Sequence, residues 1–448
     1  MDLATFEPTK RLTDETVPEG DDRSHFRRDR DIILYTSAFK RLSGVTQVVS
    51  PETGHAFHNR LTHTLQVAQV GRSLAEKLHK HFPEQAKALG LDPDVVEASC
   101  LAHDLGHPPF GHVGEETLNK LMGEEAEGFE GNAQSFRIVS ELAFRSANFV
   151  GLNLTRGTLR AILKYPWTYA KRPQTKRKKW GAYQSEIVAF EHATGDHQGG
   201  PAIPAPESRL MDWADDLTYS VHDVEDFYRA GLIPLHLLRP AVDSGCPPDK
   251  ERDRFLQYVW SRRDSLPEIN ELGESELDRK FAQLMATYFR SENAYDGTRE
   301  QRSLLRTFTG RLVNRYINGS SLSGIDEQVA LSFDKGLRSE LAILKQLTWC
   351  YVIERPGLAV QQHFQKQAIR YLFGVFRNEV NRSPSNLLPP YYQQRLRDIR
   401  KIEGAQGGPR SKRLVCDLIA GMTEHQATVL YQRLNGIAQA SGLDNLLM

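Results

Sequence analysis

The chain is predicted to be all-α, on three features of its sequence. Apolar residues recur at steps of three and four along most of its 448 residues, which is the period of an amphipathic helix. The alternation of apolar and polar residues that marks a half-buried strand is scarce. Short breakers containing Gly, Pro or Asn separate the periodic segments. Hydrophobic residues make up 40% of the chain and charged residues 25%, which excludes a fully disordered protein.

Helical periodicity begins near residue 31. Residues 1–30 are polar and charged, and we expect them to form an N-terminal arm or a loosely ordered lead-in. From about residue 31 to 82 the pattern turns helical, and one stripe recurs at helical steps. The members of this stripe are Leu65, Ala68, Arg72, Ala75 and Leu78. All but the arginine are apolar, so the stripe predicts one apolar helix face.

Two more helices are indicated by signals at their ends. Asp92 is a good N-cap and Pro93 fits the first helical position, so a helix is expected to begin there. It should end near Gly106, because two prolines follow. A third helix is expected to begin near residues 114–116.

Later segments carry weaker signals. Residues 191–208 are rich in Gly, Pro and Ala and are expected to form a surface loop. A long helix is expected from about residue 207 to 230, closed by Gly231. Breakers such as residues 318–320 and 404–409 then separate further amphipathic helices.

Composition excludes several classes of protein. No stretch approaches the roughly 18 apolar residues that a membrane span needs, and no basic segment followed by an apolar one begins the chain. The four cysteines form no C-x-x-C pair, so a disulfide framework and a cysteine-rich zinc site are not expected. We therefore expect a cytoplasmic protein with no membrane partner. The 57 basic residues balance the 57 acidic ones, which argues against a generally basic coat protein for nucleic acid.

The strongest chemical signal is the string L-A-H-D-L-G-H-P-P-F-G-H-V-G-E at residues 101–115. Adjacent His103 and Asp104 at a helix end can face one cation, and imidazole plus carboxylate suits a divalent transition metal. A lone His-Asp pair would usually be a surface or capping pair. The flanking glycines and prolines favour the metal interpretation, and they are expected to place His107 and His112 on a tight, exposed turn.

Two other segments bring candidate ligands. His63 lies at the start of a predicted helix, where a side chain can reach a neighbouring helix end; alone, such a histidine is more often a cap or a surface residue. Further along, polar residues recur at helical steps on one face, where an apolar stripe would be usual. They are Asp212, Asp215 or Asp216, Tyr219 and Asp223. If the His-Asp string were absent, a solvated acidic face would be the preferred interpretation of this second segment.

The order of these motifs resembles that of HD-domain metal-dependent phosphohydrolases, and in particular of bacterial deoxyguanosinetriphosphate triphosphohydrolase-like proteins. The likeness extends from about Phe26 to the C-terminus. It also includes N-R-L-T-H-T at 59–64, E-G-N-A-Q at 130–134, L-K-Y-P at 163–166, A-D-D-L-T-Y-S-V-H-D-V-E-D at 214–226 and I-A-G-M-T at 419–423. The resemblance implies an HD-domain helical core with an extended helical C-terminal region.

The resemblance implies a site with one divalent cation. Mn²⁺ or Mg²⁺ is expected first, with Fe²⁺, Ni²⁺, Zn²⁺ or Co²⁺ as other possibilities. The implied ligands are His63, His103, Asp104 and Asp215, where Asp215 is preferred to Asp216 because the family's ligand lies four residues before a tyrosine. The implied reaction is hydrolysis of deoxynucleoside triphosphates, dGTP or several, at the α-phosphate, which releases a deoxynucleoside and tripolyphosphate.

The resemblance also assigns roles around the metal. His112 matches the catalytic histidine and Glu115 the carboxylate that orients it. The substrate-binding positions are expected to contact the phosphates, the sugar hydroxyl or the sugar wall. They are Gln47, Arg60, His107, Lys164, Tyr165, Tyr219 and Asp223.

Charge is unevenly distributed along the chain. Ten Lys and Arg residues and no acidic residue lie between residues 142 and 185. The run can be a solvated loop or a nucleic-acid patch, or its ends, Lys164 and Lys179, can cover a triphosphate of about four negative charges. We therefore expect the net charge of zero to hide an uneven distribution, with one strongly cationic segment. The middle of this segment is expected to become ordered only when substrate binds.

The predicted organisation has three parts: an arm at 1–30, an HD catalytic domain at 31–235 with a basic insertion at 165–206, and a helical region at 236–448 that completes the pocket and the oligomer contacts. Expected partners are a dNTP substrate, further copies of the chain, with a hexamer favoured by the resemblance, and a nucleotide or single-stranded DNA effector.

Two alternatives remain open at this point. A different HD enzyme, such as a phosphodiesterase or a 5′-nucleotidase, would generally bring extra histidines for a second metal. A nucleotide- or DNA-sensing module that had kept the fold would be expected to lose ligands, whereas all of them are intact here.

Overall fold

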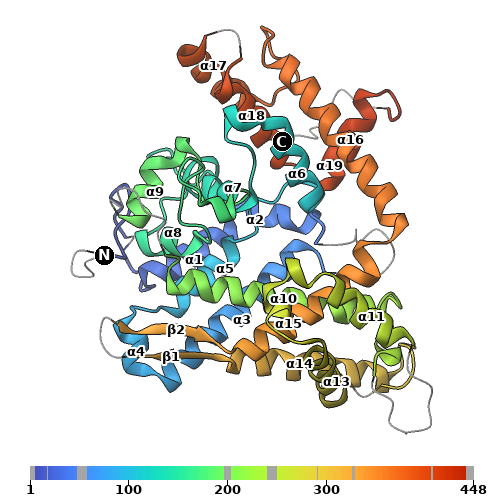
Figure 1. The fold of residues 1–448 in the computed structure, drawn as a ribbon. Helices are drawn as coiled ribbons and strands as arrows, with labels where there is room; N and C mark the ends of the chain where they lie inside the picture. The colour runs from blue at the N-terminus through green and yellow to red at the C-terminus, as the bar shows by residue number, and fades with distance from the viewer. Residues whose placement is uncertain are drawn as a thin grey trace.

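Nineteen α-helices and one two-stranded sheet make up the described part of the chain (Figure 1). The computed structural model describes residues 6–17, 19–47, 58–195, 203–239, 250–289, 291–324, 328–404 and 407–439. The all-α prediction is confirmed. The strands β1 (Ser320–Ser323) and β2 (Ala330–Phe333) form a short antiparallel hairpin with Ser320 opposite Phe333.

The helices follow one another in this order: α1 (His25–Tyr35), α2 (Ser37–Arg41), α3 (Arg60–His81), α4 (Pro83–Ala88), α5 (Pro93–Ala102), α6 (Gly111–Met122), α7 (Gly131–Arg137), α8 (Arg156–Ile162), α9 (Ile187–Thr194), α10 (Pro206–Arg229), α11 (Lys250–Ser261), α12 (Pro267–Asn270), α13 (Glu274–Tyr288), α14 (Arg299–Asn318), α15 (Lys335–Thr348), α16 (Pro356–Glu379), α17 (Pro390–Glu403), α18 (Pro409–Ala420) and α19 (Glu424–Leu434).

The main core is organised around α3, α5 and α10, which pack against one another. Helices α1 and α8 cover α5, while α14 and α15 pack on α10. The side chains of Leu74, Leu101 and Leu217 are fully or almost fully buried at this junction. Full burial of one such side chain contributes about 1.5–3 kcal/mol to the stability of the fold, so these contacts stabilise the packing of the three central helices.

A second core joins α6 to the C-terminal helices. Buried residues of α6, such as Leu118 and Met122, share an apolar cluster with α16 and α18. Helices α11 to α15 belong to the main core instead. The domain boundaries proposed from the sequence therefore stay a prediction, and the packing divides the C-terminal half between two cores.

The expected helix ends agree with the structure at two places. Asp92 caps α5, accepting hydrogen bonds from the backbone N–H groups of Asp94 and Val95, and Pro93 is the first helical residue. The long helix expected over 207–230 is α10. The third helix begins at Gly111, a few residues earlier than expected. Residues 196–202 of the expected surface loop lie outside the described residues, and α9 occupies its first part.

Two expectations for the N-terminal part need correction. The lead-in is not loose over 6–17: Arg11 is 7% exposed and forms an ion pair of 2.8 Å with Asp29, because a buried carboxylate requires a cationic partner. The predicted stripe on α3 is also only partly right. Leu65 is 45% exposed, and the buried face instead includes Val67, Val70 and Leu74. Within the described ranges, no helix is both long and apolar enough to cross a membrane.

Candidate metal and phosphate site

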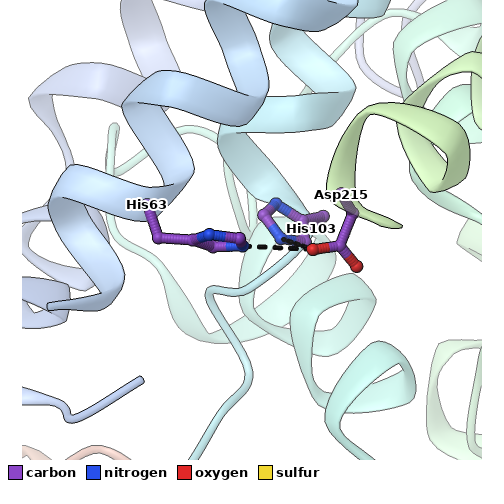
Figure 2. Close-up of side chains that lie close together, drawn as sticks. All are labelled: His63, His103 and Asp215. Atoms are coloured by element: carbon purple, nitrogen blue, oxygen red, sulfur yellow. Dashed lines mark hydrogen bonds and ion pairs between the residues drawn. The ribbon is translucent and has the colours of Figure 1, made fainter. Parts of the chain in front are cut away.

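Three predicted ligands meet at the centre of the main core. His63 comes from the first turn of α3, His103 from the residue after α5, and Asp215 from the middle of α10. Figure 2 shows the two imidazoles directed at the same carboxylate. Asp215 Oδ1 lies 3.1 Å from Nε2 of His63 and 3.6 Å from Nε2 of His103. We call these three residues the buried cluster.

The backbone of α5 fixes the orientation of His103. Its Nδ1 lies 2.6 Å from the carbonyl oxygen of Cys100. A carbonyl only accepts, so Nδ1 donates and the neutral ring keeps its lone pair on Nε2. That Nε2 is buried and has no hydrogen-bond partner among the described residues. A buried nitrogen with a free lone pair, aimed at a carboxylate, is suited to a metal ion.

Asp104 was predicted to be a metal ligand together with His63, His103 and Asp215, but its carboxylate has other close partners. Its Oδ2 accepts a hydrogen bond of 2.6 Å from Arg60, and its Oδ1 lies 2.9 Å from Nδ1 of His107. The same Oδ1 is 3.4 Å from Nε2 of His103. In the buried cluster the ligand atoms all lie within 4.8 Å of one another, and Asp104 does not belong to that group. The role of Asp104 as a fourth ligand therefore stays a prediction.

The charges around the buried cluster favour a cation. Burial by itself would lower the pKa of His103, but Asp104 and Asp215 raise it to about 9. The pKa of Asp215 is held well below its usual range by the neighbouring imidazoles in spite of burial. The donor set therefore fits a divalent metal, which would take the place of the proton that these carboxylates otherwise hold on His103.

A second cluster lies beside the first and consists of His107, His112 and Glu115. His112 Nδ1 is 3.0 Å from Oε2 of Glu115, and the rings of the two histidines are 5.5 Å apart. The expected exposed turn needs correction. His112 is exposed, with 79% of its side chain accessible, but it lies on α6, and the His107 side chain is only 12% accessible.

The second cluster has the opposite electrostatic character. Burial, together with the nearby guanidinium of Arg60, lowers the pKa of His107 to about 4. Burial would raise the pKa of Glu115, but the hydrogen bond with His112 and the positive charge of Lys179 lower it strongly. His107 is therefore neutral at ordinary pH, and Glu115 is ionised and able to hold His112 in one orientation.

The turn between α5 and α6 is built from close backbone contacts. A Cβ on Gly106 would lie 2.2 Å from the carbonyl oxygen of Gly131, so only glycine fits there. Arg41 donates hydrogen bonds to the carbonyl oxygens of Leu105 and His107. Glu424 accepts from the backbone N–H of Phe110. Contacts from distant parts of the chain thus fix the positions of both histidine clusters.

Both clusters border one pocket of about 680 Å³, a size typical of small-molecule sites. Its walls contain all of the residues predicted for the site except His63 and Asp223. Gln47, Arg60 and Tyr219 are among the lining residues. Asp223 lies one helical turn beyond Tyr219 on α10 and is 5% exposed, and burial raises its pKa well above the usual range. Its predicted contact with the sugar stays a prediction.

Cationic side chains converge on the pocket from the acid-free segment. Lys164 lies 2.5 Å from Asp212 and 3.8 Å from Asp215. Lys179 lies 2.9 Å from Glu130 and 3.6 Å from Glu115. The middle of the segment is among the described residues, and its ordering by substrate stays a prediction. There the Lys176 ammonium lies 5.4 Å from the centre of the Tyr165 ring.

Several lining residues were not predicted from the sequence. They come from α15, the π-helical turn Trp349–Ile353 and α16, and include Lys345, Trp349, Ile353, Leu358, Gln361, Gln362, Gln365 and Lys366. Glutamines on an amphipathic helix are ordinary surface residues, so no sequence signal set them apart. Only the packing of α16 on α6 brings them to the pocket.

Comparison with known proteins agrees with this geometry. The HD domain family model matches residues 60–220, which include the buried cluster, and the phosphohydrolase-associated domain matches residues 331–433. The chain is 36% identical to the deoxyguanosinetriphosphate triphosphohydrolase-like protein of Streptomyces coelicolor, over 94% of this chain and 95% of the relative. It is 34% identical to that of Corynebacterium efficiens (94% and 93%) and 31% identical to that of Shewanella baltica (95% and 95%).

Proposed function

The chain belongs to the deoxyguanosinetriphosphate triphosphohydrolase-like family, and on that premise we propose that it hydrolyses deoxynucleoside triphosphates, dGTP or several, at the α-phosphate. The products are then a deoxynucleoside and tripolyphosphate. The enzyme is a hydrolase that acts on phosphoric ester bonds, and its HD domain contains a group of histidine and aspartate residues that could hold a metal ion.

The observation that carries the proposal is that a cation-attracting cluster and the cationic side chains of Lys164 and Lys179 border a single pocket. His63, His103 and Asp215 would hold the divalent metal, with Asp104 as a fourth ligand. When bound, that metal supplies positive charge against the phosphate oxygens. Mn²⁺ or Mg²⁺ is proposed first, and Fe²⁺, Ni²⁺, Zn²⁺ or Co²⁺ also accept such ligands.

The remaining residues bind the phosphates and handle the proton. Lys164 and Lys179 neutralise the triphosphate, because neighbouring carboxylates raise the pKa of each lysine in spite of burial and so keep it charged. His107 is neutral and buried and can donate or accept a hydrogen bond at a phosphate oxygen. His112, held by Glu115, exchanges a proton with the attacking water or the leaving 5′-oxygen.

Product analysis tests the proposal. Incubation of dGTP with the enzyme and Mn²⁺ should yield deoxyguanosine and tripolyphosphate in equal amounts on anion-exchange chromatography. Release of pyrophosphate or orthophosphate would favour a different HD enzyme. Metal-dependent nucleotide binding without any product would favour a sensing module.

Two properties are proposed on the resemblance to relatives, namely assembly into a hexamer and response to a nucleotide or single-stranded DNA effector. A cytoplasmic location is proposed from the cysteine pattern. For the effector, the exposed side chains of Lys171, Arg177 and Lys178 offer a cationic surface near the pocket. Analytical ultracentrifugation gives the assembly state. Assays with and without an oligonucleotide, at low and high salt, test the effector.

A further inference from the structure

The two flanks of the pocket differ in chemistry. On one flank, α10 and the acid-free segment provide charged groups such as Lys164 and Asp215. The other flank is formed by α16. Helix α16 lies on one side of α6, and helices α7, α8 and α9 lie on the other side (Figure 1). The α16 flank contributes mainly amide and apolar side chains, one lysine (Lys366) and no carboxylate among its described lining residues. A dNTP has the same division, with charge at one end and an uncharged, flat base at the other.

Three glutamines on α16 have unused hydrogen-bonding groups. Gln361 and Gln365 lie one turn apart on the same helix face, and Gln362 lies beside them. All three are partly buried and line the pocket. Their side-chain amides make no hydrogen bond with any described residue. By contrast, Gln367 on the same helix is exposed and does not line the pocket.

Apolar groups stand next to these amides. Trp349, Ile353 and Leu358 line the same flank and offer flat or aliphatic surface. An aromatic or aliphatic surface can pack on the face of a base, while an amide, which carries both donors and an acceptor, can bond to its edge. Lys366 adds one cationic donor at the end of the row.

We propose that this flank binds the nucleobase, and that Gln361, Gln362 and Gln365 determine which dNTP is preferred. The inference rests on the proposed function. A glutamine amide can form two hydrogen bonds with a base edge that presents a matching donor and acceptor. It therefore discriminates against bases whose edges lack that pattern. The preference among dNTPs is thus assigned to α16, whereas turnover depends on the two histidine clusters.

The test compares Gln361→Ala, Gln365→Ala and the double variant with the matched control Gln367→Ala. For each, kcat/KM is measured with the four dNTPs and with 1′,2′-dideoxyribose 5′-triphosphate, which has no base. We expect the double variant to reduce the ratio between the best and the worst dNTP by about tenfold or more. The base-free substrate should be the least affected, and the control should keep the wild-type ratios.

Two results would overturn the inference while the proposed function stands. One is an active double variant whose preference among the dNTPs is that of the wild type. The other is an equal loss for the base-free substrate and for the dNTPs, which would mean that the glutamines support the fold or the phosphates. If the wild type hydrolyses no dNTP under any metal, the proposed function fails and the assignment of α16 fails with it.

Discussion

The two histidine clusters touch the same pocket, yet their environments are opposite. The buried cluster brings together His63 of α3, His103 just after α5 and Asp215 of α10 around one carboxylate. The second cluster of His107, His112 and Glu115 lies on one turn and the start of α6, and its His112 faces solvent. Asp104 lies between them and contacts a histidine of each.

Burial alone does not determine the protonation state of a histidine in this site. His103 and His107 are four residues apart and both largely buried, but the pKa of His103 is raised to about 9 by carboxylates, and that of His107 is lowered to about 4 by burial and Arg60. One position attracts a cation and the other stays neutral beside cationic groups. A reaction on a metal-bound anionic phosphate needs both.

The largest effect is expected at the carboxylate of the buried cluster. Asp215→Asn should reduce kcat/KM by at least about 10³-fold, since the metal contributes several kcal/mol to phosphate chemistry. Asp216→Asn is the matched control, because Asp216 pairs with Lys345 at 2.6 Å instead of with the histidines. Metal content by mass spectrometry should fall in the first variant only. Equal metal loss in both would remove the distinction between these aspartates.

The next effect is expected at the exposed histidine. His112→Ala should lower kcat by about 10²–10⁴-fold, the range for a general acid or base. Its metal content, dNTP binding and melting temperature should match the wild type, because the side chain is 79% accessible. Normal turnover by this variant would show that the second cluster does not take part in proton transfer.

A smaller effect is expected outside both clusters, at His222 on α10. Burial, followed by the charges of His58 and His63, lowers its pKa from 6.5 to about 4. Between these values the unfolded chain takes up a proton that the folded chain does not, so stability falls as pH falls below about 6.5. The wild type should lose about 2 kcal/mol more than His222→Gln between pH 7 and pH 5, measured by urea unfolding. Parallel pH profiles would show that His222 is not the group that titrates.

Most of the site could be predicted from the sequence because its functional residues lie in short local motifs. His103 and Asp104 stand side by side, and the cap at Asp92 and the glycine at 106 set the ends of that segment. Asp215 and Asp216 could not be separated from the residues alone, since both are on α10. Only the packing of α3 and α15 on that helix directs one to His63 and the other to Lys345.

Two features needed tertiary structure. The position of Asp223 away from the pocket wall depends on how deeply that turn of α10 is buried. The glutamine flank depends on α16 packing against α6, a contact between residues about 250 positions apart, which no local pattern encodes. Where function depends on such distant packing, the residues look ordinary in the sequence.

The most direct test of the central claim is a hydrolysis of dGTP in H₂¹⁸O. If water attacks the α-phosphorus and the bond to the 5′-oxygen breaks, one ¹⁸O atom enters the tripolyphosphate and none enters the deoxyguanosine. Label in orthophosphate, in a nucleotide product or in the 5′-hydroxyl of the nucleoside would contradict the account.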